Sequence, residues 1–205
     1  MILTDKQLHI VTHDVPWPAD YGGVIDLFSK LRALHIQGVN IQLHCFTQGR
    51  PVQEELNKYC SSVKYYRRNN NSSGFSLSIP YIVNSRANAE LIANLQKDDH
   101  PVLLEGIHCT YYLNNGKLDN RKIVVRLHNA EFEYYKQLAG QENNFLKKLY
   151  FLFESRLLKK YENSIANKAT FIAVSKHDVE VYKNEFEARD IHYLPVFLPY
   201  TLAVG

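Results

Sequence analysis

The stretch that decides the fold is "LHIVTHDVPWPADYGGVIDLFSKLRAL", residues Leu8–Leu34. It opens with an apolar run typical of a buried strand, and from Gly23 onward its apolar residues have the spacing of a helix. Between the two lies a loop that contains two prolines, a tryptophan and the pair Gly22-Gly23. A strand that leads through a loop into a helix is the unit from which helix-covered parallel sheets are built.

The same alternation continues along the chain. Runs rich in β-branched and aromatic residues predict strands at Leu8–Thr12, Ile41–Phe46, Val63–Arg67, Val102–Glu105, Ile123–Leu127, Thr170–Val174 and Ile191–Leu194. Helical patterns cover Gly23–Gln37, Gln53–Tyr59, Arg86–Gln96, Glu131–Ala139, Asn144–Asn167 and Lys176–Phe186. Several strands are apolar on both faces, so we predict an α/β, Rossmann-like domain: a mostly parallel sheet of about seven strands with helices on both faces.

Composition excludes several classes of protein. The chain has 205 residues, 45% of them hydrophobic, which suffices for a buried core. The N-terminus lacks a signal-peptide pattern and no apolar run reaches membrane-spanning length, so a cytoplasmic protein is expected. A net charge of +3 is too small to require nucleic acid, and no nucleic-acid partner is expected. The cysteines Cys45, Cys60 and Cys109 lack CxxC spacing and are predicted to be reduced, mostly buried thiols.

The glycine pair invites comparison with nucleotide-binding loops. Neither GxGxxG nor GxxxxGK[ST] is present, and the loop Asp14–Tyr21 is too long and too rich in proline for a tight dinucleotide turn. No nicotinamide cofactor is therefore expected. Gly22 and Gly23 still stand where a helix begins, and a phosphate or sugar can approach a backbone without Cβ atoms closely. From the local sequence, a simple turn with unusual dihedral angles explains the pair equally well.

Polar residues follow the strand Ile123–Leu127. His128, Asn129 and Glu131 come at its carboxyl end, where open parallel sheets bind their ligands. Histidine side chains are common acid and base groups in enzymes, which makes His128 the candidate catalytic residue. The alternative for Asn129 is that it caps the following helix.

A second cluster follows the strand Val102–Glu105. Glu105, Gly106 and His108 would lie at the same edge of the sheet; the alternative is a turn glycine flanked by surface polar residues. Metal sites are not expected, because the pairs His44-Cys45 and His108-Cys109 are adjacent in sequence, and neither HExxH nor CxxC occurs.

The long helix Asn144–Asn167 carries two patterns. An apolar arc is predicted to pack on the sheet: Leu146, Tyr150, Phe153, Leu157 and Tyr161. A basic stripe consists of Lys148, Arg156, Lys159 and Lys160, and it includes Phe145 and Leu152. A solvated basic face explains the stripe, and a peripheral contact with a membrane surface or a partner is the alternative.

Five segments together resemble a known family. They are "PWPADYGG", "VRLHNAEFEYY", "YFLFESRLLKKYE", "FIAVSKHD" and "YLPVF". In this order and spacing, over nearly the whole chain, they resemble the N-terminal half of group 1, retaining glycosyltransferases with the GT-B fold. The resemblance implies one half of a GT-B fold: an acceptor-side domain at residues 1–194 and the start of an interdomain linker at residues 195–205. The C-terminal donor domain of the same chain would then be absent from these residues.

The resemblance also implies an activity and a site. Such enzymes transfer a sugar from a nucleotide-sugar donor, here to a glycan or lipid-linked acceptor in bacterial polysaccharide or glycolipid synthesis, and they are generally metal independent. Gly22 and Gly23 match the glycines that approach the donor diphosphate, and His128 matches the histidine near the reacting sugar. Contacts with acceptor or substrate are predicted for Tyr21, Glu105, His108, Asn129 and Glu131. This part alone is expected to be inactive.

The donor-side E-x7-E motif of that family has an apparent copy here. Glu154 and Glu162 have the right spacing, but both lie in the middle of the long helix and are not predicted to bind a donor. Two other functions stay open: a nucleotide-sugar epimerase of the same fold, and a one-domain, non-enzymatic α/β module that binds an anion or a protein partner.

Overall fold

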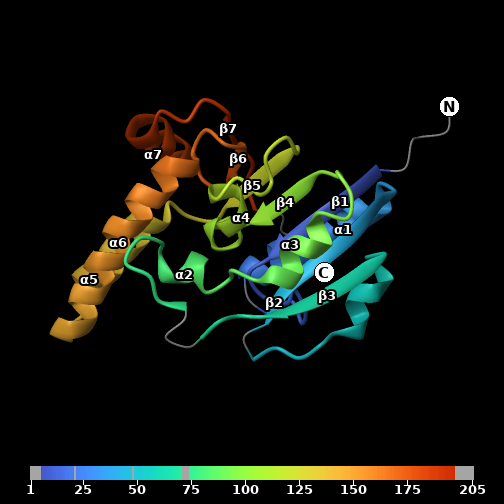
Figure 1. Ribbon diagram of the computed structural model, residues 1–205, viewed down its shortest axis with the longest axis horizontal. Coiled ribbons are helices and arrows are strands. Elements are labelled where there is room, and N and C mark those ends of the chain that lie inside the picture. Colours follow the sequence, from blue (N-terminus) through green and yellow to red (C-terminus); the bar gives the residue numbers. More distant parts are fainter. Residues whose placement is uncertain (1–5, 21, 48, 71–73, 197–205) are drawn as a thin grey trace, which may run out of the picture.

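The sheet is the centre of the molecule. The computed structural model describes residues 6–20, 22–47, 49–70 and 74–196. In these residues seven strands form one parallel sheet in the order β3-β2-β1-β4-β5-β6-β7 (Figure 1). The strands are β1 (Lys6–Thr12), β2 (Val39–Thr47), β3 (Ser62–Arg67), β4 (Val102–Glu105), β5 (Ile123–Leu127), β6 (Thr170–Ala173) and β7 (Ile191–Tyr193). The predicted α/β, Rossmann-like class is confirmed, with every strand pair parallel.

Most predicted helices are present. They are α1 (Gly22–Ile36), α3 (Ala89–Leu95), α5 (Glu131–Gln141), α6 (Phe145–Ile165) and α7 (Lys176–Phe186), while the segment predicted at Gln53–Tyr59 is the 3₁₀ helix η1 (Glu54–Lys58). Sequence analysis missed α2 (Tyr81–Asn84), η3 (Ile107–Cys109) and α4 (Tyr111–Asn114), because a single turn is too short to show a period. None of the described helices is both long enough and apolar enough to cross a bilayer.

The helices divide between the two faces of the sheet. The chain moves from β1 through β2 to β3 in one direction, then returns and moves from β4 to β7 in the other. Because such crossovers are right-handed, α1 and η1 cover one face and the later helices cover the opposite face. The buried apolar side chains accordingly form two clusters. Cys45 and Cys60 lie in the cluster beneath α1 and Cys109 in the other, and all three thiols are buried and free, as predicted.

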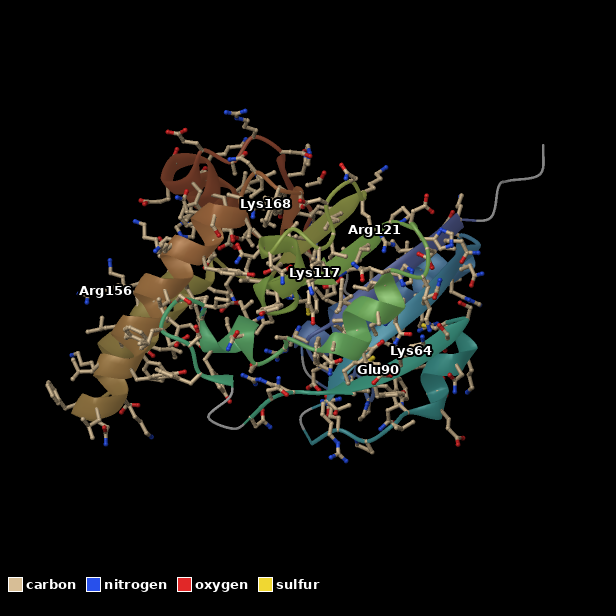
Figure 2. The ribbon with its side chains drawn as sticks, viewed as in Figure 1. Lys64, Glu90, Lys117, Arg121, Arg156 and Lys168 are labelled. Carbon is tan, nitrogen blue, oxygen red and sulfur yellow. The ribbon has the colours of Figure 1, made fainter. Side chains whose placement is uncertain are left out.

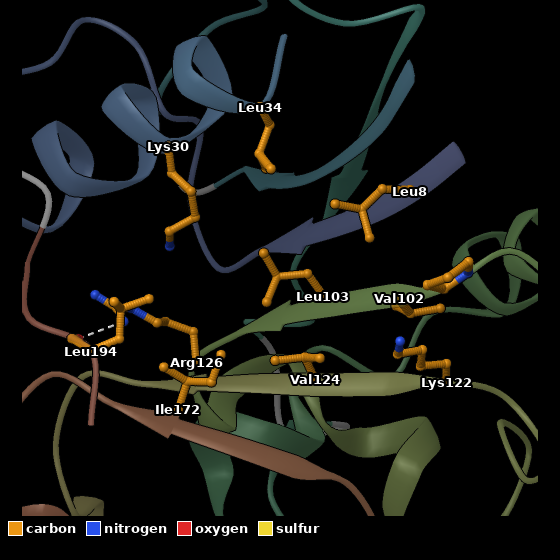
Figure 3. A pocket seen from close by; sticks show the side chains of 11 residues that line it. Leu8, Lys30, Leu34, Val102, Leu103, Lys122, Val124, Arg126, Ile172 and Leu194 are labelled. Atoms are coloured by element: carbon orange, nitrogen blue, oxygen red, sulfur yellow. Dashed lines mark hydrogen bonds between the residues drawn. The ribbon is translucent and has the colours of Figure 1, made fainter. Parts of the chain in front are cut away.

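On the face that carries α1, an apolar pocket of about 370 Å³ lies beside the helix (Figure 3). Its floor comes from side chains of β1, β4, β5 and β6, including Leu103, Val124 and Ile172. Lys30 and Leu34 of α1 line one side of the pocket, and no other described helix contributes to its lining.

The face of α6 that packs inward differs from the predicted arc. Leu146 and Tyr150 are 74% and 37% exposed, so the expectation that the whole apolar arc packs on the sheet is wrong. The buried side chains of α6 are Glu154, Ser155, Leu158, Tyr161, Glu162 and Ile165. The first half of α6 pairs with α5 beyond the sheet (Figure 1), so its apolar residues have no sheet to cover.

Two carboxylates belong to this buried face because they bind backbone amides. Glu154 accepts a hydrogen bond from the Tyr81 amide at 2.9 Å, at the start of α2. Glu162 accepts one from the Phe132 amide at 2.9 Å, in the first turn of α5, and another from the Tyr182 hydroxyl at 2.7 Å. Both glutamates therefore satisfy donors that helix starts leave unpaired.

A buried polar chain runs beneath α3. His9 and His44 are 0% and 1% exposed, and Nδ1 of His9 lies 2.9 Å from Nε2 of His44. Nε2 of His9 lies 2.9 Å from Asp98, and Nδ1 of His44 lies 2.8 Å from the Tyr66 hydroxyl, which also accepts from the Asn94 amide. The Asp98 carboxylate can only accept, so each histidine donates through Nε2 and accepts through Nδ1. All the hydrogen bonds of this series can point in the same direction only when both imidazoles are neutral.

The neutral histidines make stability depend on pH. Burial, opposed by Asp98, lowers the pKa of His9, and burial together with His9 and Lys64 lowers the pKa of His44 to about 3. Below pH 6.5, the ordinary pKa of histidine, the unfolded chain binds protons at His9 and His44 that the folded chain does not bind. Stability conferred by the neutral pair is thus complete above that pH and is lost as pH falls towards 3.

We expect the melting temperature to fall as pH is lowered from about 7.5 to about 5, and the slope to be smaller in the His44→Leu variant. Thermal unfolding followed by circular dichroism measures both slopes. His35→Gln, at an exposed position on α1, is the matched control and should keep the original slope. Equal slopes in His44→Leu and the parent protein would contradict this account.

Candidate functional site

The candidate site lies at the carboxyl edge of the sheet. Strands β1 and β4 are neighbours, but the chain leaves them towards opposite sides of the sheet, and ligands of open α/β sheets bind at such a switch point. His13 follows β1, Glu105 ends β4, and His128 follows β5. His108, in η3, comes next to them. The structure therefore brings together three predicted residues, Glu105, His108 and His128, and adds His13.

The His13 imidazole contacts the rings of both His108 and His128. The rings of His13 and His108 stack with centroids 5.1 Å apart, and the edge of His128 meets His13 at 5.6 Å. Burial, with help from His128, lowers the pKa of His13 to about 4, and burial and Arg86 hold the pKa of His108 well below its ordinary value. Both rings are neutral at pH 7, so each offers one donor and one acceptor. The side chain of His128 is 21% exposed, and His13 and His108 are also only partly buried.

Gly106 makes this arrangement possible. Its φ is +81°, a conformation that side chains disfavour. A Cβ atom there would lie 3.0 Å from Nδ1 of His108 and 3.5 Å from Cδ2 of His128. Gly106 is thus a turn glycine, as the alternative stated, but its neighbour Glu105 is fully buried instead of lying at the surface.

Glu105 connects His128 to a buried lysine. Oε1 of Glu105 accepts a hydrogen bond from Nζ of Lys30 at 2.6 Å, and Oε2 lies 3.4 Å from Nε2 of His128. The second distance is long for a hydrogen bond but within ion-pair range. Burial alone would raise the pKa of Glu105; Lys30 and His128 outweigh it and lower the pKa to about 2. Glu105 is therefore an ionised carboxylate that holds the orientation of the His128 ring from its buried side.

The ion pairs continue away from the site. Asp26, one turn before Lys30 on α1, lies 3.5 Å from Nζ of Lys30 and 3.6 Å from Nη2 of Arg126. Arg126 donates to the backbone carbonyls of Leu194 and Pro195 at 2.7 and 3.0 Å. Figure 3 shows Lys30 and Arg126 reaching the end of the apolar pocket beside Leu194. Buried charges thus link the candidate site to the segment after β7.

Lys30, Asp26 and Arg126 were not predicted. Asp26 and Lys30 form an i,i+4 pair among the apolar residues that α1 buries, and such charges on the inward side of a helix are a signal of a buried partner. His13 was also missed, although the rule that located His128 applies to it: a polar residue directly follows a buried strand.

The glycine pair forms the first turn of α1. Amides in a first helical turn have no partner within the helix, and a Cβ at Gly22 would meet nothing within 4 Å. Gly22 therefore presents open backbone at the start of a helix, as an anion site requires. Tyr21, predicted to contact the acceptor or substrate, lies outside the described residues.

The loop before these glycines is firmly held. Arg50 donates to the carbonyl of Pro18 at 2.8 Å and to the carboxylate of Asp20, and its Nε lies 3.5 Å from Asp14. The Trp17 ring packs against Phe28 of α1, with centroids 4.7 Å apart. These contacts tie the loop to α1 and to Arg50 in the segment that follows β2.

Asn129 and Glu131 have different surroundings. Asn129 is exposed and, with His128, lines an open pocket of about 280 Å³ between α5 and α7. It does not cap α5, because the amide of Ala130 donates to Asp178 at 2.8 Å and Glu162 binds the amide of Phe132. Glu131 is 4% exposed, and burial raises its pKa to about 7 although His128 opposes the shift. It lies behind the pocket and is not one of its lining residues.

Metal ligation is a separate question. Among the described residues no three or more His, Cys, Asp or Glu side chains are arranged to hold a metal ion. The contacts within the histidine cluster are contacts between rings.

Comparisons with known proteins show similarity to a curated protein and to a solved structure. No family model matches the chain. An "uncharacterized 44.6 kDa protein in cps region" of Klebsiella pneumoniae is 31% identical over an alignment of 182 residues, and the alignment covers 83% of this chain and 46% of that protein. The chain therefore spans less than half the length of this relative. The structure of Phytolacca americana UGT2 complexed with UDP-2fluoro-glucose and pterostilbene matches with a TM-score of 0.54 and 10% identity, over 93% of this chain and 54% of that one.

At this identity the structural match shows the fold alone. The domain has the Rossmann-like form of one half of a GT-B glycosyltransferase fold, and the resemblance found in the sequence is supported at that level.

Proposed function

We propose that this chain is the acceptor-side domain of a retaining group 1 glycosyltransferase, which transfers a sugar from a nucleotide-sugar donor to a glycan or lipid-linked acceptor. The observation that carries the proposal is the edge of the sheet at β1, β4 and β5. There Glu105 restrains His128, whose side chain reaches solvent, and the open helix start at Gly22 belongs to the loop that leaves β1.

The comparisons support this proposal at a coarser level. The solved neighbour is a glycosyltransferase in complex with UDP-2fluoro-glucose, and the curated relative is encoded in a cps region. Because the chain spans 46% of that relative, the proposal assigns the donor side to a second domain of the same polypeptide.

Each part of the site has a role in the proposed reaction. Transfer requires a departing diphosphate to be stabilised, and the amides at the start of α1 are suited to that charge. Nε2 of His128 is buried and faces Oε2 of Glu105 at 3.4 Å, so this nitrogen is not open to a substrate. Nδ1 is therefore the atom that we assign to the reacting sugar or its developing charge. No metal and no cofactor is required in this scheme, in which the nucleotide sugar is a substrate.

The proposal is tested by Gly23→Val in the full-length protein. We expect loss of sugar transfer without loss of folding, because the new side chain occupies the space where the diphosphate approaches the first turn of α1. Formation of glycosylated acceptor and release of nucleoside diphosphate are measured together, and circular dichroism monitors folding.

Gly140→Val is the matched control. Gly140 is also helical, and a Cβ there meets nothing within 4 Å, as at Gly22, but it lies in α5 far along the chain from the glycine pair. Undiminished transfer in Gly23→Val would mean that the pair merely begins a helix. A free epimerised sugar as the product, without need of an acceptor, would favour the epimerase instead.

A further inference from the structure

An apolar surface lies at the free end of the α5–α6 pair. The two helices run side by side away from the sheet (Figure 1), and the first turns of α6 leave large apolar side chains in solvent. Phe145 is 69% exposed, Leu146 74%, Leu149 47% and Tyr150 37%. We call these four residues, with Lys147 and Lys148 between them, the hairpin tip. A protein in water seldom gathers so many exposed apolar side chains without a partner for them.

The exposed charge of α6 has a single sign. The helix contains five basic residues, which are Lys147, Lys148, Arg156, Lys159 and Lys160. Its two acidic residues, Glu154 and Glu162, are both 0% exposed and are occupied by backbone amides. Only the basic residues are therefore presented to the surroundings.

Acidic neighbours compensate little of this charge. Lys159 pairs with Glu185 of α7 at 2.6 Å. In the turn between the helices, Glu142 accepts a hydrogen bond from the Asn144 amide at 2.8 Å. Ion pairs to Lys147, Lys148, Arg156 and Lys160 are not formed by the described residues. The surface of the helix thus keeps an excess of positive charge.

Apolar and basic residues share one face of the helix. At about 100° per residue, Phe145, Leu149 and Arg156 fall within about 40° of one another around the axis. Arg156 points away from the body of the protein (Figure 2). It lines, with Lys159 and Lys160, an open pocket of about 340 Å³ that continues this face. The face is therefore apolar at its free end and basic two turns later.

We propose that the hairpin tip binds the surface of an anionic lipid bilayer. Phe145, Leu146 and Leu149 enter the boundary between headgroups and acyl chains, while Lys147 and Lys148 extend their ammonium groups to the phosphates. Arg156 and Lys160 remain at the level of the headgroups. A bilayer is the occupant that fits both observations, because it offers an apolar interior beneath a negatively charged surface. This inference does not depend on the proposed transfer reaction.

The test is sedimentation of the protein with vesicles. One set contains equal parts of phosphatidylglycerol and phosphatidylcholine, and the other contains phosphatidylcholine alone. We expect binding to the anionic set, weaker binding to the neutral set, and a decrease of anionic binding with added salt.

Two groups of variants separate the contributions. The triple variant Phe145→Ser, Leu146→Ser, Leu149→Ser is expected to reduce binding at least about tenfold, because it removes the inserted apolar area. Lys147→Glu with Lys148→Glu is expected to reduce it by about twentyfold or more, at about fivefold for each charge removed. All these positions are exposed, so folding should not change.

Matched controls use exposed positions elsewhere. Ile36→Ser with Val52→Ser removes apolar side chains that are 75% and 66% exposed, and Arg32→Glu with Lys183→Glu makes the same change of net charge as the double lysine variant. Both controls should bind as the parent protein does.

Three outcomes would overturn the inference. They are failure of the parent protein to bind anionic vesicles, undiminished binding by the tip variants, and equal losses in the controls. Light scattering adds a further check, because self-association that disappears in the triple variant would assign the hairpin tip to a second copy of the chain instead of a bilayer.

Discussion

Replacing Lys30 with methionine is expected to lower the free energy of unfolding by about 3 kcal/mol or more, because it leaves the Glu105 carboxylate buried without its closest cation. Lys30 is 8% exposed and lies 2.6 Å from Glu105, which is fully buried. Methionine keeps most of the aliphatic volume, so the loss reports the charge and not a cavity. Urea denaturation measures the change.

Two further variants make this result specific. Arg32→Met, at an exposed position on the same helix, should change stability by less than about 0.5 kcal/mol. Lys30→Met combined with Glu105→Gln should recover part of the loss, because the second change removes the uncompensated charge. If the double variant lost the full sum of the two single changes, the pair would not be coupled.

Replacing His128 with alanine is expected to reduce sugar transfer about 100-fold or more while the protein stays folded. The reason is that the proposed reaction places Nδ1 of this ring at the reacting sugar, whereas its side chain is partly exposed and fills no closed core. The rate of transfer by the full-length protein and its melting temperature are measured on the same preparation.

His177→Ala is the matched control for this change. His177 lines the same open pocket as His128, but its side chain is 67% exposed and pairs with Glu133. We expect transfer by this variant to stay within a few-fold of the parent rate. Similar losses in both variants would indicate a general effect of the pocket and would remove the special role of His128.

The two predictions concern one structural unit. Lys30 and Glu105 lie behind His128, so Lys30→Met is also expected to loosen the restraint on the imidazole. A variant that lost only stability would show that Glu105 does not position the ring.

Local pattern was sufficient for the strands. Each predicted strand matches one of the observed strands, because a short apolar run bounded by polar or turn residues has little freedom to be anything else in a covered parallel sheet. The same pattern marks where each strand ends, and it therefore located Glu105, His108 and His128 before any contact between them was known.

Helix packing was not predictable in this way. The predicted apolar arc of α6 would suit a helix that lies on the sheet along its whole length. The first half of α6 instead extends past the sheet, and the second half buries two glutamates. A carboxylate at such a position is explained only by its acceptor role towards amides of α2 and α5, which lie far away in the sequence.

The order of residues along the chain therefore determined the secondary structure, the parallel sheet and the edge at which polar groups gather. Tertiary structure decided which of those groups act together. Lys30 and Glu105 are 75 positions apart, and their hydrogen bond exists because β1 and β4 became neighbours and α1 returned over that junction. The spacing of apolar residues in the sequence indicates which face of each helix or strand is buried. The partner of a buried charge depends instead on which helices and strands become neighbours in the fold.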